Sequence, residues 1–145
     1  SFRSIKRSEL FSNEKPRSSE LPVEVILLDT LGELPILYGL ADLVFVGGSL
    51  VPWGGHNLLE PAIFKKPVLF GPHMNNFREM SQHFIQAEAG IMVQNEVELG
   101  ERFIALYRDN TLRQTLGNNG YKIIQINQGA ADRILDRITK FLQPS

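Results

Sequence analysis

The chain has 145 residues, of which 43% are hydrophobic and 21% charged, and its formal net charge is −1. This composition and length fit one ordinary globular domain and exclude disordered and collagen-like chains. The absence of cysteine excludes disulfides and thiolate metal sites, and the near-zero charge argues against a nucleic-acid partner. No apolar run approaches the length of a membrane span and no signal-peptide core opens the chain, so we expect a soluble chain.

Residues 1–11 open the chain without a Met and read as the end of a helix followed by a short turn. We therefore expect the chain to be part of a longer protein, with the first strand of its sheet lying upstream of residue 1. Residues 12–22 are polar, contain two prolines and are predicted to form a loop.

Four short apolar runs follow, and each is continuous enough to predict a strand that is buried on both faces. They span residues 23–29, 43–47, 67–71 and 90–94. Helical patterns lie between them at 32–41, 57–65 and 77–87. Further helices are predicted at 96–108, about 111–127 and about 130–142, with Gly129 ending the second of these three. The alternation predicts an α/β fold in which helices flank a Rossmann-like parallel sheet.

Residues 47–61, GGSLVPWGGHNLLEP, connect a predicted strand to a predicted helix and contain four glycines. In open α/β sheets, ligands bind at the carboxyl ends of the strands, and free N–H groups at a helix start suit a phosphate. Gly54 and Gly55 would let the backbone approach such a ligand, His56 could donate to it, and Trp53 could stack on a base. On this interpretation the crossover is an anion or nucleotide site, although it is neither a P-loop nor a G-x-G-x-x-G motif.

The same residues also fit a purely structural interpretation. Glycine pairs often serve tight turns, and Asn57 with Glu60 matches a variant of the capping box that stabilises a helix by about 1 kcal/mol without any ligand. Polar turns at residues 29–33 and 71–77 follow two other predicted strands. Together with the crossover at residues 47–61 they make three polar turns at one edge of the sheet, which favours a ligand site there. Spacing alone leaves both interpretations open.

Two other kinds of site are disfavoured. The three histidines, His56, His73 and His83, lack the H-x-x-x-H spacing of a zinc site, and no G-x-S-x-G motif of a serine hydrolase is present.

Several motifs together resemble one family. They are DTLGEL at 29–34, GGSLVPWGGHNLLEP at 47–61, GPHMNNFRE at 71–79 and NQGAADRIL at 127–135. On these motifs the chain resembles the bacterial 3-deoxy-D-manno-octulosonic acid (Kdo) transferases over about residues 23–140. The resemblance implies GT-B architecture, in which two Rossmann-like domains face a cleft. Residues 1–145 would then be the C-terminal domain, which binds the donor CMP-Kdo, without the N-terminal acceptor domain.

The resemblance also implies roles for individual residues. Gly32 and Glu33 would lie by the cytidine, and Glu60 would accept from the ribose hydroxyls. The remaining donor-binding residues would be Gly48, Ser49, and, at the phosphate, Gly54, Gly55, His56 and Asn57. His73, Asn76 and Phe77 would line the cleft nearer the sugar. No catalytic residue and no activity are expected in this chain alone, because the general base of the family lies in the N-terminal domain.

The full-length enzyme implied by the resemblance moves Kdo to a lipid A precursor in lipopolysaccharide synthesis, at the cytoplasmic face of the inner membrane. Acceptor and membrane contacts would come through the N-terminal domain. No metal cofactor is expected, because the chain has no D-x-D motif and the donor carries one phosphate. Two departures bear on donor affinity: a PRHPER-like segment of the family is absent, and Trp53 stands where a smaller aliphatic residue is expected. The alternatives are another sugar-nucleotide enzyme of GT-B architecture, such as an epimerase, and a non-catalytic α/β module.

Overall fold

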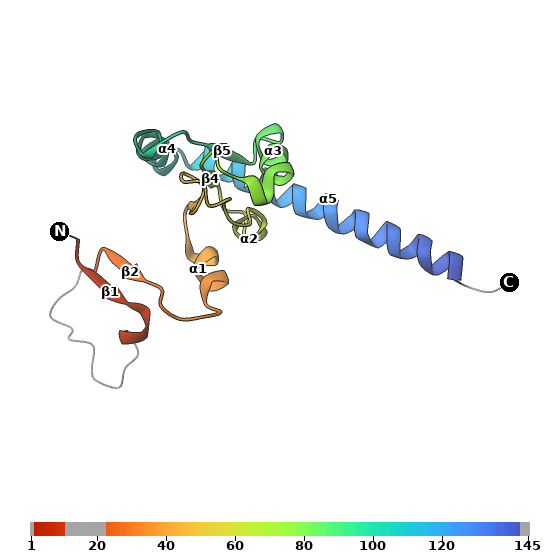
Figure 1. Ribbon diagram of the computed structural model, residues 1–145, viewed down its shortest axis with the longest axis horizontal. Coiled ribbons are helices and arrows are strands. Elements are labelled where there is room, and N and C mark those ends of the chain that lie inside the picture. Colours follow the sequence, from red (N-terminus) through yellow and green to blue (C-terminus); the bar gives the residue numbers. More distant parts are fainter. Residues whose placement is uncertain (1, 11–22, 143–145) are drawn as a thin grey trace. The chain divides into compact units, whose positions relative to one another are not determined.

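The computed structural model describes residues 2–10 and 23–142, and their side chains as far as residue 128 (Figure 1). The chain divides into two compact units, Ser1–Leu37 and Tyr38–Ser145, which we describe separately. Parallel strands and helices make up both units, which confirms the predicted α/β class.

The first unit contains a two-stranded parallel sheet. Strand β1, Ser4–Lys6, pairs with β2, Val25–Leu27, so that Ile5 lies opposite Ile26. A 3-10 helix, η1, Arg7–Glu9, follows β1. The prediction that residues 1–11 end a helix was therefore wrong. A strand of three residues with one apolar side chain is too short to show an alternating pattern, and its partner lies beyond the predicted loop.

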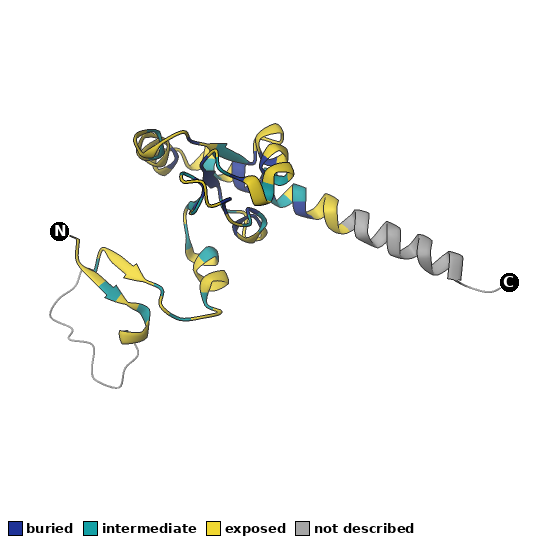
Figure 2. Ribbon diagram, viewed as in Figure 1, coloured by how far each residue is buried: buried dark blue, intermediate teal, exposed yellow. Residues whose placement is uncertain are grey.

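Strand β2 was predicted to be buried, and this prediction was wrong as well. The exposed fractions of Val25, Ile26 and Leu27 are 43%, 55% and 55%, and Figure 2 shows β2 in the colour of exposed residues. The physical reason is that, among the strands within residues 2–10 and 23–142, β2 pairs with β1 alone, in a two-stranded sheet. Helix α1, Leu34–Leu40, follows β2 and is one residue shorter at its C-terminal end than predicted.

The second unit is built on a three-stranded parallel sheet in the order β3-β4-β5. The strands are β3, Val44–Val46, β4, Val68–Phe70, and β5, Gly90–Met92. Helix α2, Leu59–Ile63, connects β3 to β4. The 3-10 helix η2, Asn75–Phe77, and helix α3, Arg78–Gln86, connect β4 to β5. The strands predicted at 43–47, 67–71 and 90–94 are thus confirmed with shorter bounds.

The central strand β4 is completely buried because helices cover both faces of this sheet. Val68 and Phe70 pack with Phe84 of α3, while Leu69 faces the opposite side. There it packs with Leu106 of α4, Glu96–Arg108, and with the start of α5. This alternation along β4 is the period of two expected of a strand between two helix layers.

Helix α5 runs unbroken from Asn110 to Leu142, so the prediction that Gly129 ends a helix was wrong. A glycine in a helix interior costs only about 1 kcal/mol relative to alanine, and Ala130 and Ala131 follow it as strong helix formers. None of the helices in the ranges given above has the length and hydropathy that a membrane span requires.

Candidate functional site

The glycine-rich crossover leaves β3 and folds back on itself before α2. Gly48, Gly54 and Gly55 have φ angles of +66°, +92° and +72°, which favour glycine over other residues. The N–H of Gly55 donates to the carbonyl of Gly48 at 3.0 Å and closes the loop. Trp53, with 80% of its surface exposed, lies outside the core.

Ser49 ties this crossover to the turn that follows β4. Its hydroxyl donates to the Val46 carbonyl at 2.5 Å and accepts from the N–H of Gly71 at 2.8 Å. Its carbonyl accepts from the N–H of His73 at 2.9 Å. Since Ser49 is completely buried, its observed role is to position the two turns rather than to present a hydroxyl to solvent.

The pair Gly54–Gly55 is explained by packing within the chain. A Cβ built on Gly54 would lie 2.7 Å from Cγ of Asn76, and one on Gly55 would lie 3.0 Å from Cε of Met74. Both glycines are buried. The turn at residues 71–77 therefore requires glycine at both positions even without a ligand, and the ligand-binding role given to them by the sequence stays a prediction.

The polar groups that remain accessible belong to His56, Asn57 and Glu60. Oδ1 of Asn57 accepts from the N–H of Leu59, the first residue of α2, at 3.0 Å, although the residue directly before the helix is Leu58, whose side chain makes no cap. His56 and Glu60 are exposed. Among the described hydrogen bonds, none uses the backbone N–H of His56 or Asn57, and none joins Glu60 to Asn57 as the capping box requires. The exposed side chains of His56 and Glu60, and backbone N–H groups without a described partner, are thus the polar groups that this end of the crossover presents.

The carboxylate of Glu60 also acts on its surroundings within the unit. Burial raises the pKa of Tyr38, and the negative charge of Glu60 raises it further. In the described part of the chain, no three acidic or histidine side chains gather as metal ligands would.

A cavity of about 500 Å³ adjoins the crossover, between the η2–α3 segment and α5. Asn76 and Phe77, two of the residues predicted to line the cleft, do line this cavity. Asn76 connects it to the crossover, because its N–H donates to the Gly54 carbonyl at 3.2 Å. His73 is half-buried and is not among the lining residues.

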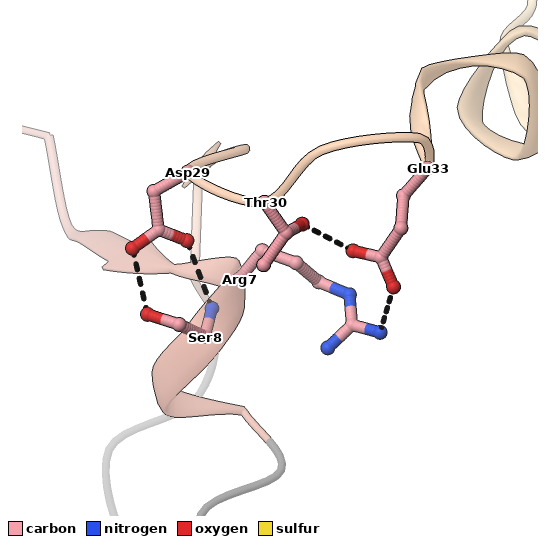
Figure 3. Close-up of polar contacts among 5 residues, drawn as sticks. All are labelled: Arg7, Ser8, Asp29, Thr30 and Glu33. Atoms are coloured by element: carbon pink, nitrogen blue, oxygen red, sulfur yellow. Dashed lines mark hydrogen bonds and ion pairs between the residues drawn. The ribbon is translucent and has the colours of Figure 1, made fainter.

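Glu33 lies in the first unit, in the turn between β2 and α1 (Figure 3), and Gly32 directly precedes it in the sequence. Gly32 has a φ of +82°, which the turn requires. The Glu33 carboxylate accepts from the guanidinium of Arg7 at 2.7 Å and from the hydroxyl of Thr30. The sequence reasoning missed Arg7, because this partner lies 26 positions from Glu33 in a segment predicted to end a helix.

Asp29, beside this turn, accepts two hydrogen bonds from Ser8. Its oxygens lie 2.6 Å from the Ser8 hydroxyl and 3.0 Å from the Ser8 N–H, and both bonds lower the pKa of Asp29 below 3.8. A lowered folded-state pKa stabilises the fold above the unfolded value, and this contribution is lost as the pH falls through the folded value.

We expect carboxyl NMR titration to give Asp29 a pKa below 3.8, and Ser8→Ala to raise it, because the hydroxyl makes the larger contribution. Glu24→Gln, which removes another exposed carboxylate of this unit, should leave the pKa of Asp29 where it is. An unchanged pKa in Ser8→Ala would contradict the assigned cause.

Comparison with known proteins gives consistent matches. No family model matches the sequence. The chain is 41% identical over 143 residues to the 3-deoxy-D-manno-octulosonic acid transferase of Haemophilus influenzae, covering 98% of this chain and 32% of that protein. It is 33% identical over 141 residues to the Rickettsia conorii protein of the same name, covering 94% and 30%. The chain thus spans about a third of the length of these relatives.

A solved structure matches as well. The chain superposes on the C-terminal CMP-Kdo binding domain of WaaA from Acinetobacter baumannii with a TM-score of 0.74 and 29% identity, covering 86% of this chain and 62% of that one. Together these matches confirm the resemblance inferred from the sequence motifs and the fold class.

Proposed function

From its homology to the Kdo transferases along 98% of its length, we propose that this chain is the donor-binding domain of such an enzyme. The observation that carries the proposal is the match to a CMP-Kdo binding domain over 86% of the chain. The complete enzyme would move Kdo from CMP-Kdo to a lipid A precursor. We assign the acceptor, the general base and the contact with the inner membrane to an N-terminal domain.

The proposed chemistry follows from the groups at the crossover. Transfer from a nucleotide sugar develops positive charge at the anomeric carbon and negative charge on the leaving phosphate. The N–H groups of His56 and Asn57, which have no partner among the described hydrogen bonds, suit that phosphate. Glu60 would accept from the ribose hydroxyls. We assign no metal ion to this step, because a single phosphate develops less charge than a diphosphate.

The test is Glu60→Gln in a calorimetric titration with CMP. We expect CMP affinity to fall about tenfold, because a charge-assisted hydrogen bond becomes a neutral one. The melting temperature should stay within about 1 °C of the parent, because Glu60 is exposed and has no described hydrogen bond to the helix start. Glu101→Gln, which removes an exposed carboxylate from α4, is the charge-matched control.

Three results would count against the proposal. Tighter binding of UMP than of CMP would favour another sugar-nucleotide enzyme of this architecture. A parent chain that binds neither CMP, UMP nor AMP would favour a non-catalytic module. A large fall in melting temperature of Glu60→Gln with unchanged CMP binding would show that Glu60 stabilises the helix start and does not bind the ribose.

A further inference from the structure

The cavity beside the crossover combines groups that recognise sugars. Its volume of about 500 Å³ lies within the range of small-molecule sites. Asn76 and Asn127 contribute amides that can donate to and accept from hydroxyls, and Phe77 contributes an aromatic ring. Glu79 adds a carboxylate that can accept from hydroxyls. The lining thus suits a polyhydroxylated ligand larger than the phosphate alone.

Arg78 adds a positive charge to the lining of this cavity, and the local structure does not explain why an arginine stands at this position. No hydrogen bond or ion pair of its guanidinium is found in the part of the chain whose side chains are described. Arg78 begins α3, where the helix dipole disfavours a cation, so the residue does not serve helix stability. Its neighbour Glu79 does not neutralise it, because adjacent residues of a helix do not face each other.

We infer that this cavity binds the carboxylated sugar of the donor and that Arg78 holds its carboxylate. A guanidinium is the side chain best matched to a carboxylate, since it can donate two parallel hydrogen bonds. Asn76 places the cavity next to the crossover, where the donor phosphate is proposed to bind. The inference rests on the proposed function and extends it. It assigns a separate binding site to the sugar acid, and it makes Arg78 a determinant of donor specificity.

The experiment compares calorimetric titrations of CMP and CMP-Kdo on the full 145-residue chain and its variants. At pH 7 both ligands carry about two negative charges, so a general charge effect would weaken both equally. We expect Arg78→Gln to weaken CMP-Kdo binding at least about tenfold and to change CMP binding less than about twofold. Arg78→Lys should recover part of the loss. The charge-matched control is Arg102→Gln, which removes an exposed arginine of α4 that forms an ion pair with Glu98.

The outcomes separate this inference from the proposed function. A parent chain that binds neither ligand overturns the proposed function, and the inference with it. A parent that binds CMP while Arg78→Gln leaves CMP-Kdo affinity unchanged overturns the inference alone. The same holds if Arg78→Gln weakens both ligands equally, or if Arg102→Gln reproduces its effect. Circular dichroism of each variant identifies any loss that comes from unfolding.

Discussion

Gly117→Ala should lower the melting temperature by about 6 °C. A Cβ at this position of α5 would lie 2.6 Å from the carbonyl carbon of Lys65, two residues after the end of α2. Backbone cannot rotate away as a side chain can, so α5 must shift from the element against which it packs most extensively. Overpacking of this kind costs about 3 kcal/mol, more than the roughly 1 kcal/mol that alanine gains over glycine in a helix. About 3 °C is lost for each kcal/mol in a chain of this size.

The matched control is Gly100→Ala in α4. No atom lies within 4 Å of a Cβ built there, so the helix-propensity gain should appear alone and raise the melting temperature slightly. Thermal unfolding followed by circular dichroism measures both variants. If Gly117→Ala were as stable as Gly100→Ala, the close packing of α5 on the end of α2 would be wrong.

Gly55→Val should destabilise the second unit by about 3 kcal/mol even without a ligand. Valine at a φ of +72° is strongly disfavoured, and its Cβ would lie 3.0 Å from Cε of Met74 and 3.4 Å from the His73 carbonyl. If Gly55 served only to let the backbone approach a ligand, as the sequence interpretation holds, the variant would be expected to fold normally and to fail only in CMP binding. The structure replaces it, because the turn after β4 fills the space beside Gly55.

Gly47→Val is the control, since it places the same side chain in the same crossover. Gly47 is exposed, and no atom lies within 4 Å of a Cβ built there. We expect its unfolding free energy in urea to stay within about 0.5 kcal/mol of the parent. A Gly55→Val protein with the parent's unfolding free energy and no CMP binding would restore the earlier expectation.

The regular elements of the second unit were predictable because each has a local cause. The run VLF of β4 is apolar and continuous because helices cover both of its faces. Helix α4 begins where predicted because Asn95 caps it, with Oδ1 accepting from the N–H of Glu98 at 3.0 Å. Local sequence therefore carried enough information to place these elements and the crossover between β3 and α2.

The features that were missed depend on contacts distant in sequence. β1 exists because it pairs with a strand about twenty residues further on, and nothing within Ser4–Lys6 predicts that partner. The buried state of Gly54 and Gly55 depends on Met74 and Asn76, which belong to another turn. The donor-binding roles assigned to single residues stay predictions, because they come from the family resemblance and no bound ligand tests them.

The hydrogen bonds that join the two turns have a consequence for selectivity. Ser49 accepts from Gly71 and His73, and Gly54 accepts from Asn76, so the crossover and the turn after β4 hold one another in place. The residues of both turns already lost their conformational entropy when the chain folded. A ligand that binds them therefore loses little binding free energy to the ordering of loops. If the donor binds here as proposed, nucleotides of a different shape would bind less well, because accommodating them would require breaking these hydrogen bonds, of which that between Ser49 and Gly71 is buried.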